Sequence, residues 1–428
     1  MAATDDSVPN TPDEVQPIAM TGDRIASLDF IRGVAVMGIL AANIISMGQP
    51  ATAHPYPAAF ATDHSAAEEW MWVAQLVLID NKMRGLFTIL FGAGLYLFVE
   101  KAWARGASRM LQVRRLFWLG LFGLLHFYFV WQGDILFAYA FSGLLAVLFL
   151  LELAPRQQIV LGLLGYLAGG IFYGVSLIFM QSVADSPDPD SAALADVRAQ
   201  FLEAAESDLD EGRLETGLWQ DGSYFDLVSH VFAEHGAEPF EVVFSFAFET
   251  LPLILIGMAF YRLGLFSGAF SARVLLRWGL ALGMVGGFAT LWVALETKAA
   301  GLTYYGTMAA LVGWSHFPSL LMTAGYLAIL VALAPATGSW FGERISAAGR
   351  AAFTNYLGTS VVMLFVFGNW GLDLFGRLGR SELYVVTLFA WAIMLAWSKP
   401  WLGRFRYGPL EWLWRCLTYG KVFALRRQ

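Results

Sequence analysis

A histidine and an aspartate lie on the two sides of a predicted helical hairpin, where together they could act as a general base. His126 lies near the end of one apolar segment, and Asp134 begins the next after the turn 131–133. An imidazole held by a carboxylate is oriented and made more basic, which suits proton removal from a hydroxyl or an amine. Alternatively, Asp134 caps its own helix and His126 bonds a neighbouring helix.

A second polar group opens the first apolar segment. Asp29 and Arg32 are three residues apart, so they share one face of a helix and can form an ion pair. The pair can simply seat the helix at the membrane surface, or Arg32 can bind the phosphate of an anionic cofactor. Asn43 lies farther along the same segment, where its amide could stabilise a developing oxyanion.

Five residues are candidates for cofactor binding: Asp29, Arg32, Lys82, Arg350 and Asn355. Lys82 follows a short apolar segment, where a membrane-surface anchor is the simpler explanation. Arg350 and Asn355 open a late apolar segment, where a polar ligand or a partner helix can meet them. The single Cys416 excludes a cysteine-based cluster, and the sequence has no HExxH, no CxxC and no glycine-rich phosphate loop. We therefore expect no metal, no tightly bound cofactor and no nucleic-acid partner.

The elements that must position these residues are apolar helices. The chain is 57% hydrophobic and only 14% charged, with a mean hydropathy of +0.57, whereas soluble domains carry about a quarter charged residues. The apolar runs do not alternate with polar residues, which argues against strands. We predict an all-α, polytopic membrane protein of ten spans, or eleven if 66–80 crosses instead of lying at the interface or re-entering. The ten spans lie near 26–47, 83–101, 113–131, 134–153, 157–181, 241–263, 272–296, 306–334, 350–371 and 382–398.

Charge predicts the orientation. The connection 101–115 and the tail from 399 are strongly basic, and short basic loops stay in the cytoplasm. We therefore expect a multi-pass protein with both termini in the cytoplasm. The polar start has no signal-peptide pattern, so the first span acts as the insertion signal. The loop 48–68 and the His126–Asp134 turn then face outward.

Composition divides the chain into five parts. Segment 182–241 holds fifteen acidic and two basic residues, and we expect it to cap the outer face or to stay mobile. The division is a disordered tail (1–22), an N-terminal membrane half (23–181), an acidic extramembrane insert (182–240), a C-terminal membrane half (241–398) and a basic, Trp-rich tail (399–428). The last part has the composition of an amphipathic anchor on anionic lipid.

Several motifs occur in an order that resembles the YeiB-like family of bacterial membrane proteins, whose C-terminal part is a domain of unknown function, DUF418. The resemblance runs from about residue 22 to 422 and implies a bacterial inner-membrane location. The motifs are Arg24…Leu28-Asp29-Phe30-Ile31-Arg32-Gly33…Asn43, Leu90-Phe91-Gly92-Ala93-Gly94, His126…Gly133-Asp134-Ile135-Leu136, Gly349-Arg350…Thr354-Asn355-Tyr356-Leu357 and Gly408-Pro409…Glu411-Trp412-Leu413-Trp414-Arg415…Thr418-Tyr419.

The first motif is also similar to two families of membrane acyltransferases. Those that modify bacterial surface sugars have a histidine at the end of the first helix, which this chain lacks. The lysosomal heparan glucosaminide acetyltransferase family has an asparagine in that helix and a catalytic histidine in the next loop. His54 and His64 lie in that loop here, but their flanking residues match poorly, so we prefer His126 with Asp134.

These resemblances imply transfer of an acyl group across the lipid bilayer. A cytoplasmic thioester donor, acyl-CoA, would bind near Arg32, and His126 would activate an outward-facing hydroxyl or amine on a small molecule or an envelope glycan. A transporter or exporter of a small amphiphilic metabolite and a non-catalytic scaffold stay open as alternatives, so the sequence leaves open whether the protein is an enzyme. It is compatible with a homodimer.

Overall fold

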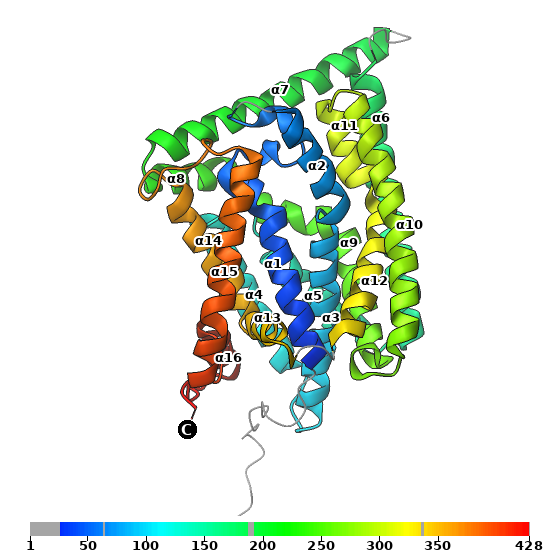
Figure 1. The fold of residues 1–428 in the computed structure, drawn as a ribbon, viewed down its shortest axis with the longest axis vertical. Helices are drawn as coiled ribbons and strands as arrows, with labels where there is room; N and C mark the ends of the chain where they lie inside the picture. The colour runs from blue at the N-terminus through cyan, green and yellow to red at the C-terminus, as the bar shows by residue number, and fades with distance from the viewer. Residues whose placement is uncertain (1–25, 63–64, 187–191, 335–337, 428) are drawn as a thin grey trace, which may run out of the picture.

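The described residues form a bundle of helices. A computed structural model describes residues 26–62, 65–186, 192–334 and 338–427, so the predicted disordered tail 1–22 and His64 lie outside the described residues. In Figure 1, the start of α1 and the connection between α3 and α4 lie at the lower end, and α7 crosses the upper end. The described part contains one isolated β-bridge, between Phe405 and Arg426, and otherwise no strand, which confirms the all-α class.

Sixteen α-helices are described, with short 3-10 or π segments between some of them. They are α1 (Ala26–Gly48), α2 (Ala66–Leu78), α3 (Lys82–Trp103), α4 (Met110–Phe129), α5 (Leu136–Leu145), α6 (Pro155–Ala184), α7 (Ala192–Asp221), α8 (Tyr224–Glu234), α9 (Glu238–Arg262), α10 (Ala272–Ala299), α11 (Tyr304–Met308), α12 (His316–Leu333), α13 (Trp340–Arg350), α14 (Ala352–Phe367), α15 (Arg380–Arg404) and α16 (Pro409–Tyr419).

Fewer helices qualify as spans than the ten or eleven predicted. Among the described residues, seven helices are long and apolar enough to cross a membrane, or eight if the bent pair α13–α14 counts as one span. Neither α4, whose first turns carry Arg114 and Arg115, nor the shorter apolar helix 136–150 is among the seven. Segment 66–80 adds no separate eleventh span, because α2 and α3 together count as one 38-residue candidate span.

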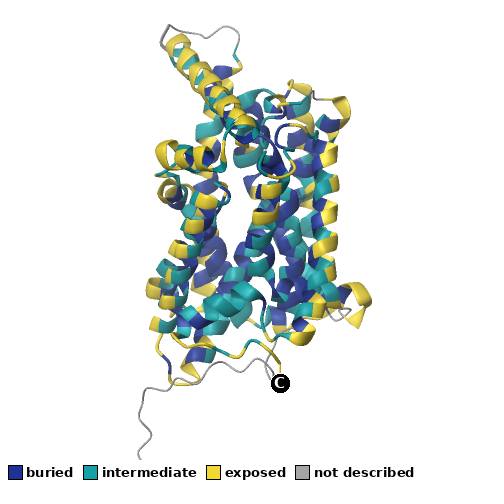
Figure 2. Cartoon of the chain, turned by 90° about the vertical axis from the view of Figure 1, so that its left-hand side faces the viewer, coloured by how far each residue is buried: buried dark blue, intermediate teal, exposed yellow. Residues whose placement is uncertain are grey.

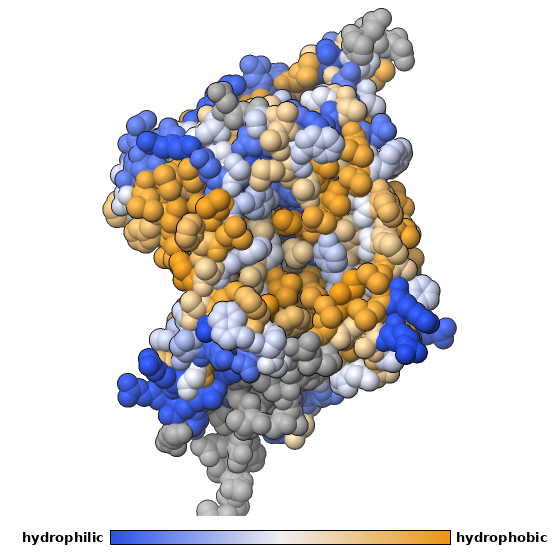
Figure 3. All heavy atoms as spheres, viewed as in Figure 1, coloured by the Kyte–Doolittle hydropathy of each residue, from blue (hydrophilic) through white to orange (hydrophobic). Residues whose placement is uncertain are grey.

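The outer surface of the bundle matches a membrane environment. Figure 3 shows apolar side chains over the middle of the visible face and hydrophilic ones at both ends, while Figure 2 shows the buried residues inside the bundle. Large exposed apolar side chains stand on the lipid-accessible helices α6, α10 and α15, for example Phe172, Trp292 and Phe389. Bundles with apolar exteriors are stable in lipid, so the protein is a multi-pass membrane protein.

The insert and the tail are both packed. Helix α7 lies across the upper end of the bundle, and Trp219 near its end stacks on Phe375 with the ring centroids 4.8 Å apart. The insert therefore caps this end, one of the two predicted arrangements. In the tail, Trp414 of α16 donates a hydrogen bond from Nε1 to the carbonyl of Arg115 on α4, at 2.8 Å. Because it is docked on the bundle, α16 does more than the lipid anchor that its composition predicts.

Close helix packing holds α13 against α1. A Cβ atom built on Gly349 would lie 1.8 Å from the carbonyl oxygen of Asp29, and one on Gly33 would lie 2.0 Å from that of Ile345. Only hydrogen fits at these positions, as in many small-residue contacts between membrane helices. The glycine pair therefore fixes the distance between the two helices that carry Asp29 and Arg350.

We expect Gly349→Ala to destabilise the protein by roughly 3 kcal/mol, because the backbone of α13 must move away from α1 to admit the methyl group. Thermal unfolding in detergent measures this loss. Gly358→Ala on α14 is the matched control, since a Cβ there meets nothing within 4 Å. Equal melting temperatures for the two variants would contradict the prediction.

Candidate functional site

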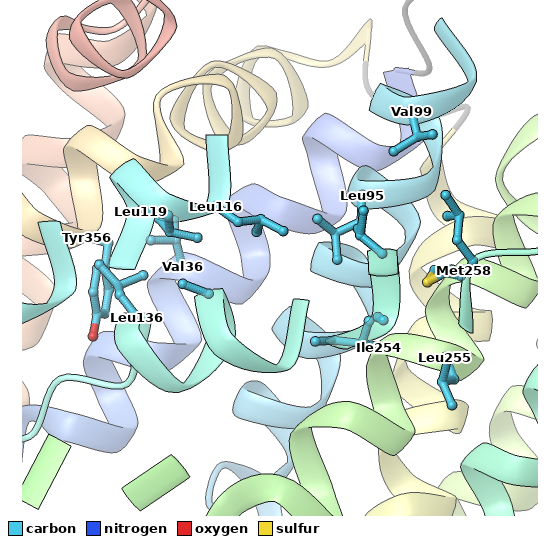
Figure 4. Close-up of a cluster of buried hydrophobic side chains, with 14 of the residues drawn as sticks. Val36, Leu95, Val99, Leu116, Leu119, Leu136, Ile254, Leu255, Met258 and Tyr356 are labelled. Atoms are coloured by element: carbon cyan, nitrogen blue, oxygen red, sulfur yellow. The ribbon is translucent and has the colours of Figure 1, made fainter. Parts of the chain in front are cut away.

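A cavity of about 340 Å³ opens between the helices in the lower half of the bundle. Its lining comes from all five sequence motifs: Asp29 and Arg32 from the first, Gly94 from the second, Leu136 from the third, Tyr356 from the fourth and Glu411 from the last. The apolar cluster beside it, shown in Figure 4, joins Val36, Leu95, Leu116 and Ile254. Segments that are far apart in the sequence therefore build one site, which we call the lower cavity.

The polar lining of the lower cavity is mainly cationic. Five basic side chains line it against the two carboxylates of Asp29 and Glu411, and they are Arg32, Lys101, Arg115, Arg350 and Arg415. Arg32 Nη1 lies 3.6 Å from Asp29 Oδ1, so the predicted ion pair forms. The remaining excess of positive charge, in a site walled by phenylalanine and leucine, suits a ligand with an anionic head and an apolar body.

Glu411 ties the tail to this cavity. Its Oε1 accepts hydrogen bonds from the backbone N–H groups of Phe353 at 2.8 Å and Thr354 at 3.1 Å, and Oε2 accepts one from the Thr354 hydroxyl. These backbone groups belong to the first turn of α14 and have no partner within that helix. A carboxylate from α16 therefore caps α14, next to the bend of 82° between α13 and α14.

The predicted His126–Asp134 pair forms directly behind the lower cavity. His126 Nδ1 lies 3.0 Å from Asp134 Oδ1, and both side chains are almost fully buried. Tyr356, which lines the cavity, donates a hydrogen bond from its hydroxyl to the same Asp134 oxygen, at 3.0 Å. Asp134 Oδ2 also accepts the backbone N–H of Leu136 at 2.9 Å, so one carboxylate oxygen binds the first turn of α5 and the other lies beside the imidazole. Neither ring nitrogen of His126 has a well-aligned hydrogen-bond partner among the described residues.

A smaller hollow of about 20 Å³ lies on the other side of the same pair, which we call the upper hollow. It is lined by Trp131, whose ring centroid is 6.4 Å from that of His126. Glu215 of α7 also lines it and accepts a hydrogen bond from Gln132 Nε2 at 2.9 Å. On the side of the lower cavity, the ring centroid of Tyr356 lies 5.6 Å from that of His126, so each of the two spaces has one lining aromatic ring close to the imidazole.

The structure does not bring three predicted residues into the lower cavity. Asn43 is partly buried on α1 and is absent from the lining. Lys82 is fully buried, and its ammonium donates a hydrogen bond to the Leu76 carbonyl at 2.6 Å. Asn355 joins three helices by donating to the Ala348 carbonyl and the Ser398 hydroxyl and accepting from Trp397 Nε1. Asn355 therefore joins α14 to α13 and α15 and does not line the predicted ligand site.

A second histidine–carboxylate pair, not predicted from the sequence, lies near the upper end. His54 Nε2 is 3.7 Å from Asp80 Oδ1, and Asp80 also accepts a hydrogen bond from Gln75 at 3.1 Å. The buried Arg380 donates from Nη1 to the Gln75 amide oxygen. Burial lowers the pKa of His54, although Asp80 opposes this effect. These residues share no sequence motif, because Arg380 of α15 lies more than 300 positions after the loop that holds His54.

The buried Glu215 predicts a pH-dependent attachment of α7. Loss of hydration raises the pKa of this carboxyl to about 7, above the 4.5 of the unfolded chain. Its stabilising contribution is therefore complete below pH 4.5 and is lost as the pH rises through 7. We expect the free energy of local unfolding of α7, measured by hydrogen exchange, to fall by roughly 2 kcal/mol between pH 5 and pH 8. Glu215→Gln should remove this dependence, and an unchanged pH profile in the variant would contradict it.

Comparison with known proteins supports the predicted resemblance. Residues 260–421 match the family described as "Protein of unknown function (DUF418)". The chain is 29% identical to "Uncharacterized protein YeiB" of Escherichia coli (strain K12), over 92% of this chain and 96% of the relative. It is 28% identical to "Uncharacterized protein YxaH" of Bacillus subtilis (strain 168), over 95% of this chain and 96% of the relative.

These relatives match 92% and 95% of the chain, so the similarity extends well beyond residues 260–421. Their names assign no activity. The matches confirm the resemblance that the motifs predict: this membrane protein is similar to YeiB and YxaH over almost its whole length, and residues 260–421, which include Arg350, Tyr356 and Glu411 of the cavity, match the DUF418 family.

Proposed function

We propose that the protein is a transmembrane acyltransferase of the bacterial inner membrane, with the lower end and both termini in the cytoplasm. A cytoplasmic acyl-CoA binds in the lower cavity, and the acceptor is a hydroxyl or an amine that arrives from the outer side. The basic side chains at the lower end support this orientation, because short basic loops are retained in the cytoplasm.

The observation that carries the proposal is the chemistry of the lower cavity. Five basic side chains line the same 340 Å³ space as Phe87, Leu90, Phe91 and Phe98. An acyl-CoA has phosphates that pair with guanidinium and ammonium groups and an acyl chain that gains from apolar walls. Among these groups, Arg115 stacks over Trp414 at 4.1 Å, so its guanidinium is held in a fixed orientation.

The His126–Asp134 pair supplies the base. In the proposed step, His126 removes the proton of the acceptor hydroxyl or amine while the acceptor atom attacks the thioester carbonyl. The carbon–sulfur bond then breaks, and the protonated imidazole returns the proton to the departing thiolate. Asp134 orients the imidazole and stabilises its charged form. The acyl carbon reaches this pair only after the Tyr356 ring moves aside, whereas Asn43 has no direct part.

Purified protein in proteoliposomes, supplied with radiolabelled acetyl-CoA or a longer acyl-CoA, tests the function. Transfer of label to outer-leaflet lipid, glycan or added alcohol supports it, and labelled CoA thioester that stays intact in the presence of all acceptors contradicts it. Comparison of envelope lipids and glycans between a wild-type and a deletion strain identifies the natural acceptor.

We expect the double variant Arg32→Gln, Arg350→Gln to raise the KM for acyl-CoA by at least tenfold, because each charge-assisted hydrogen bond to phosphate contributes about 1.5–3 kcal/mol. Arg109→Gln is the matched control, since Arg109 lies at the same end but is exposed and pairs with the exposed Glu152. A similar KM in both variants would show that the phosphates bind elsewhere.

Export of an amphiphilic anion is the second candidate function. The observation in its favour is that a space lies on each side of the His126–Asp134 pair. In an exporter, Trp131 would control access to the pair from the upper hollow, and Tyr356 would control access from the lower cavity. The same proteoliposomes decide between the two functions. An exporter moves the labelled anion across the bilayer without covalent change, whereas an acyltransferase yields a new ester or amide.

A further inference from the structure

We propose that Glu211, His230 and His235 form a binding site for a divalent transition-metal ion, Zn²⁺ above all, which joins α7 to α8 at the upper end. Glu211 lies on α7, and the two histidines lie on and just after α8. The inference is independent of the proposed acyl transfer. It departs from our expectation that the protein binds no metal, which rested on the absence of contiguous metal-binding motifs.

The donor atoms already have a suitable spacing. His230 Nε2 lies 2.7 Å and His235 Nε2 lies 3.5 Å from the same oxygen, Glu211 Oε1. One donor atom from each of the three residues can be chosen so that all lie within 4.8 Å of one another. Tetrahedral zinc with bonds of about 2.0–2.2 Å places its donors roughly 3.3 Å apart, so only small side-chain rotations are needed.

A fourth residue orients one of the ligands. His235 Nδ1 lies 3.1 Å from Glu238 Oε1, so a proton on Nδ1 is shared with that carboxylate and Nε2 is left with its lone pair. A histidine that binds metal usually donates its other N–H to a carboxylate or a carbonyl in this way. Glu238 is therefore a positioning residue, and this arrangement distinguishes the cluster from a simple group of acidic side chains.

The burial of the cluster suits an ion that enters from solution. The side chains of His230 and His235 are 12% and 17% exposed, whereas that of Glu211 is 41% exposed. The imidazoles are thus held by the surrounding protein, and the carboxylate side leaves a coordination position for water. Two imidazoles and one carboxylate are nitrogen and oxygen donors that favour zinc over magnesium or calcium.

A bound ion would stabilise the cover of the upper hollow. The lining of that hollow includes Glu215 and Trp219 from α7 and Leu227 and Val231 from α8. Glu215 follows Glu211 by one helical turn. A metal ion that joins Glu211 to α8 would therefore also hold in place the residues of α7 and α8 that line the upper hollow. The metal would therefore act by fixing these two helices, one turn away from the Glu215 contact to Gln132.

Zinc binding by the full-length protein in detergent tests the site. After treatment with EDTA, titration with Zn²⁺ alone should show one equivalent bound, and His230→Ala with His235→Ala should weaken the affinity at least 100-fold. Asp210→Asn is the matched control, because it removes a neighbouring acidic charge on α7 that pairs with Arg213 instead. Equal affinities for the wild-type protein and the double variant would overturn the proposal.

Spectroscopy on the wild-type protein provides a test that does not depend on variants. X-ray absorption of the zinc-loaded protein should show two imidazoles in the first coordination shell. The chain has only six histidines, and no other two of those described lie in one such cluster, so this result would identify the site. A shell with one imidazole or none would overturn the proposal, even if the double variant failed to fold.

Discussion

Replacing His126 by alanine is expected to lower kcat for acyl transfer by at least 100-fold and to leave the KM for acyl-CoA within about twofold. Loss of a positioned general base costs about 10² to 10⁴ in rate. The donor affinity should change little because His126 does not line the lower cavity, where the phosphates and the acyl chain bind. Single-turnover measurements with labelled acyl-CoA in proteoliposomes separate the two quantities.

Two other histidines make the test specific. His316 is also buried, stacks on Tyr166 at 4.0 Å and has no carboxylate partner among the described contacts, so His316→Asn is the matched control for loss of a buried imidazole. His54, beside Asp80, is the competing base. Activity that survives His126→Ala and disappears in His54→Ala would move the chemistry to the second histidine–carboxylate pair.

The sequence was sufficient to predict the His126–Asp134 pair because the two residues belong to neighbouring helices. A hairpin with a tight turn brings the end of one helix beside the start of the next, whatever the rest of the bundle does. The same argument works for Asp29 and Arg32, which are one helical turn apart. Local geometry therefore predicted the contacts, and the 3.0 Å and 3.6 Å separations agree with it.

Contacts between distant segments could not be predicted in this way. Arg115, Arg350 and Arg415 meet in one cavity only through the packing of α4, α13 and α16, and no periodicity in the sequence indicates which helices are neighbours. The motif around Glu411 was visible, but its basic and Trp-rich surroundings favoured a lipid anchor. Glu411 acts as a hydrogen-bond acceptor because the bend after α13 leaves the first N–H groups of α14 without a partner inside their own helix.

The number of helices that meet the length and composition criteria for a span, seven or eight, is lower than the ten or eleven spans predicted, for a related reason. Hydropathy marks segments that are buried, but it does not show whether lipid or neighbouring helices bury them. The helix 136–150 packs against α4 and α9 on one side and exposes Phe141, Leu148 and Phe149 on another. It is also shorter than the roughly 20 residues that a span needs. Likewise, Lys82 was assigned to the membrane surface, although the bend at Asn81 buries it completely.

The Glu411→Ala variant should lose roughly 3–5 kcal/mol of stability, which is a large part of the total for most proteins. The substitution removes the acceptor of three hydrogen bonds, two of them from backbone N–H groups at the start of α14. Buried donors left without a partner cost more than the bond itself contributed. Thermal unfolding in detergent measures the loss, and Glu152→Ala, at an exposed carboxylate, is the control with little expected effect.

Glu411→Gln separates this structural role from ligand binding, because its two effects have opposite signs. The amide keeps one acceptor oxygen, so the variant should lose less stability than Glu411→Ala. It also removes a negative charge from the lining of the lower cavity, which should lower the KM for acyl-CoA several-fold, since the phosphates no longer face a carboxylate. A less stable protein that binds its donor more tightly is difficult to explain by general damage to the fold. If donor binding weakens together with stability, Glu411 serves only to hold α14 and α16 together, and the anionic ligand does not approach it.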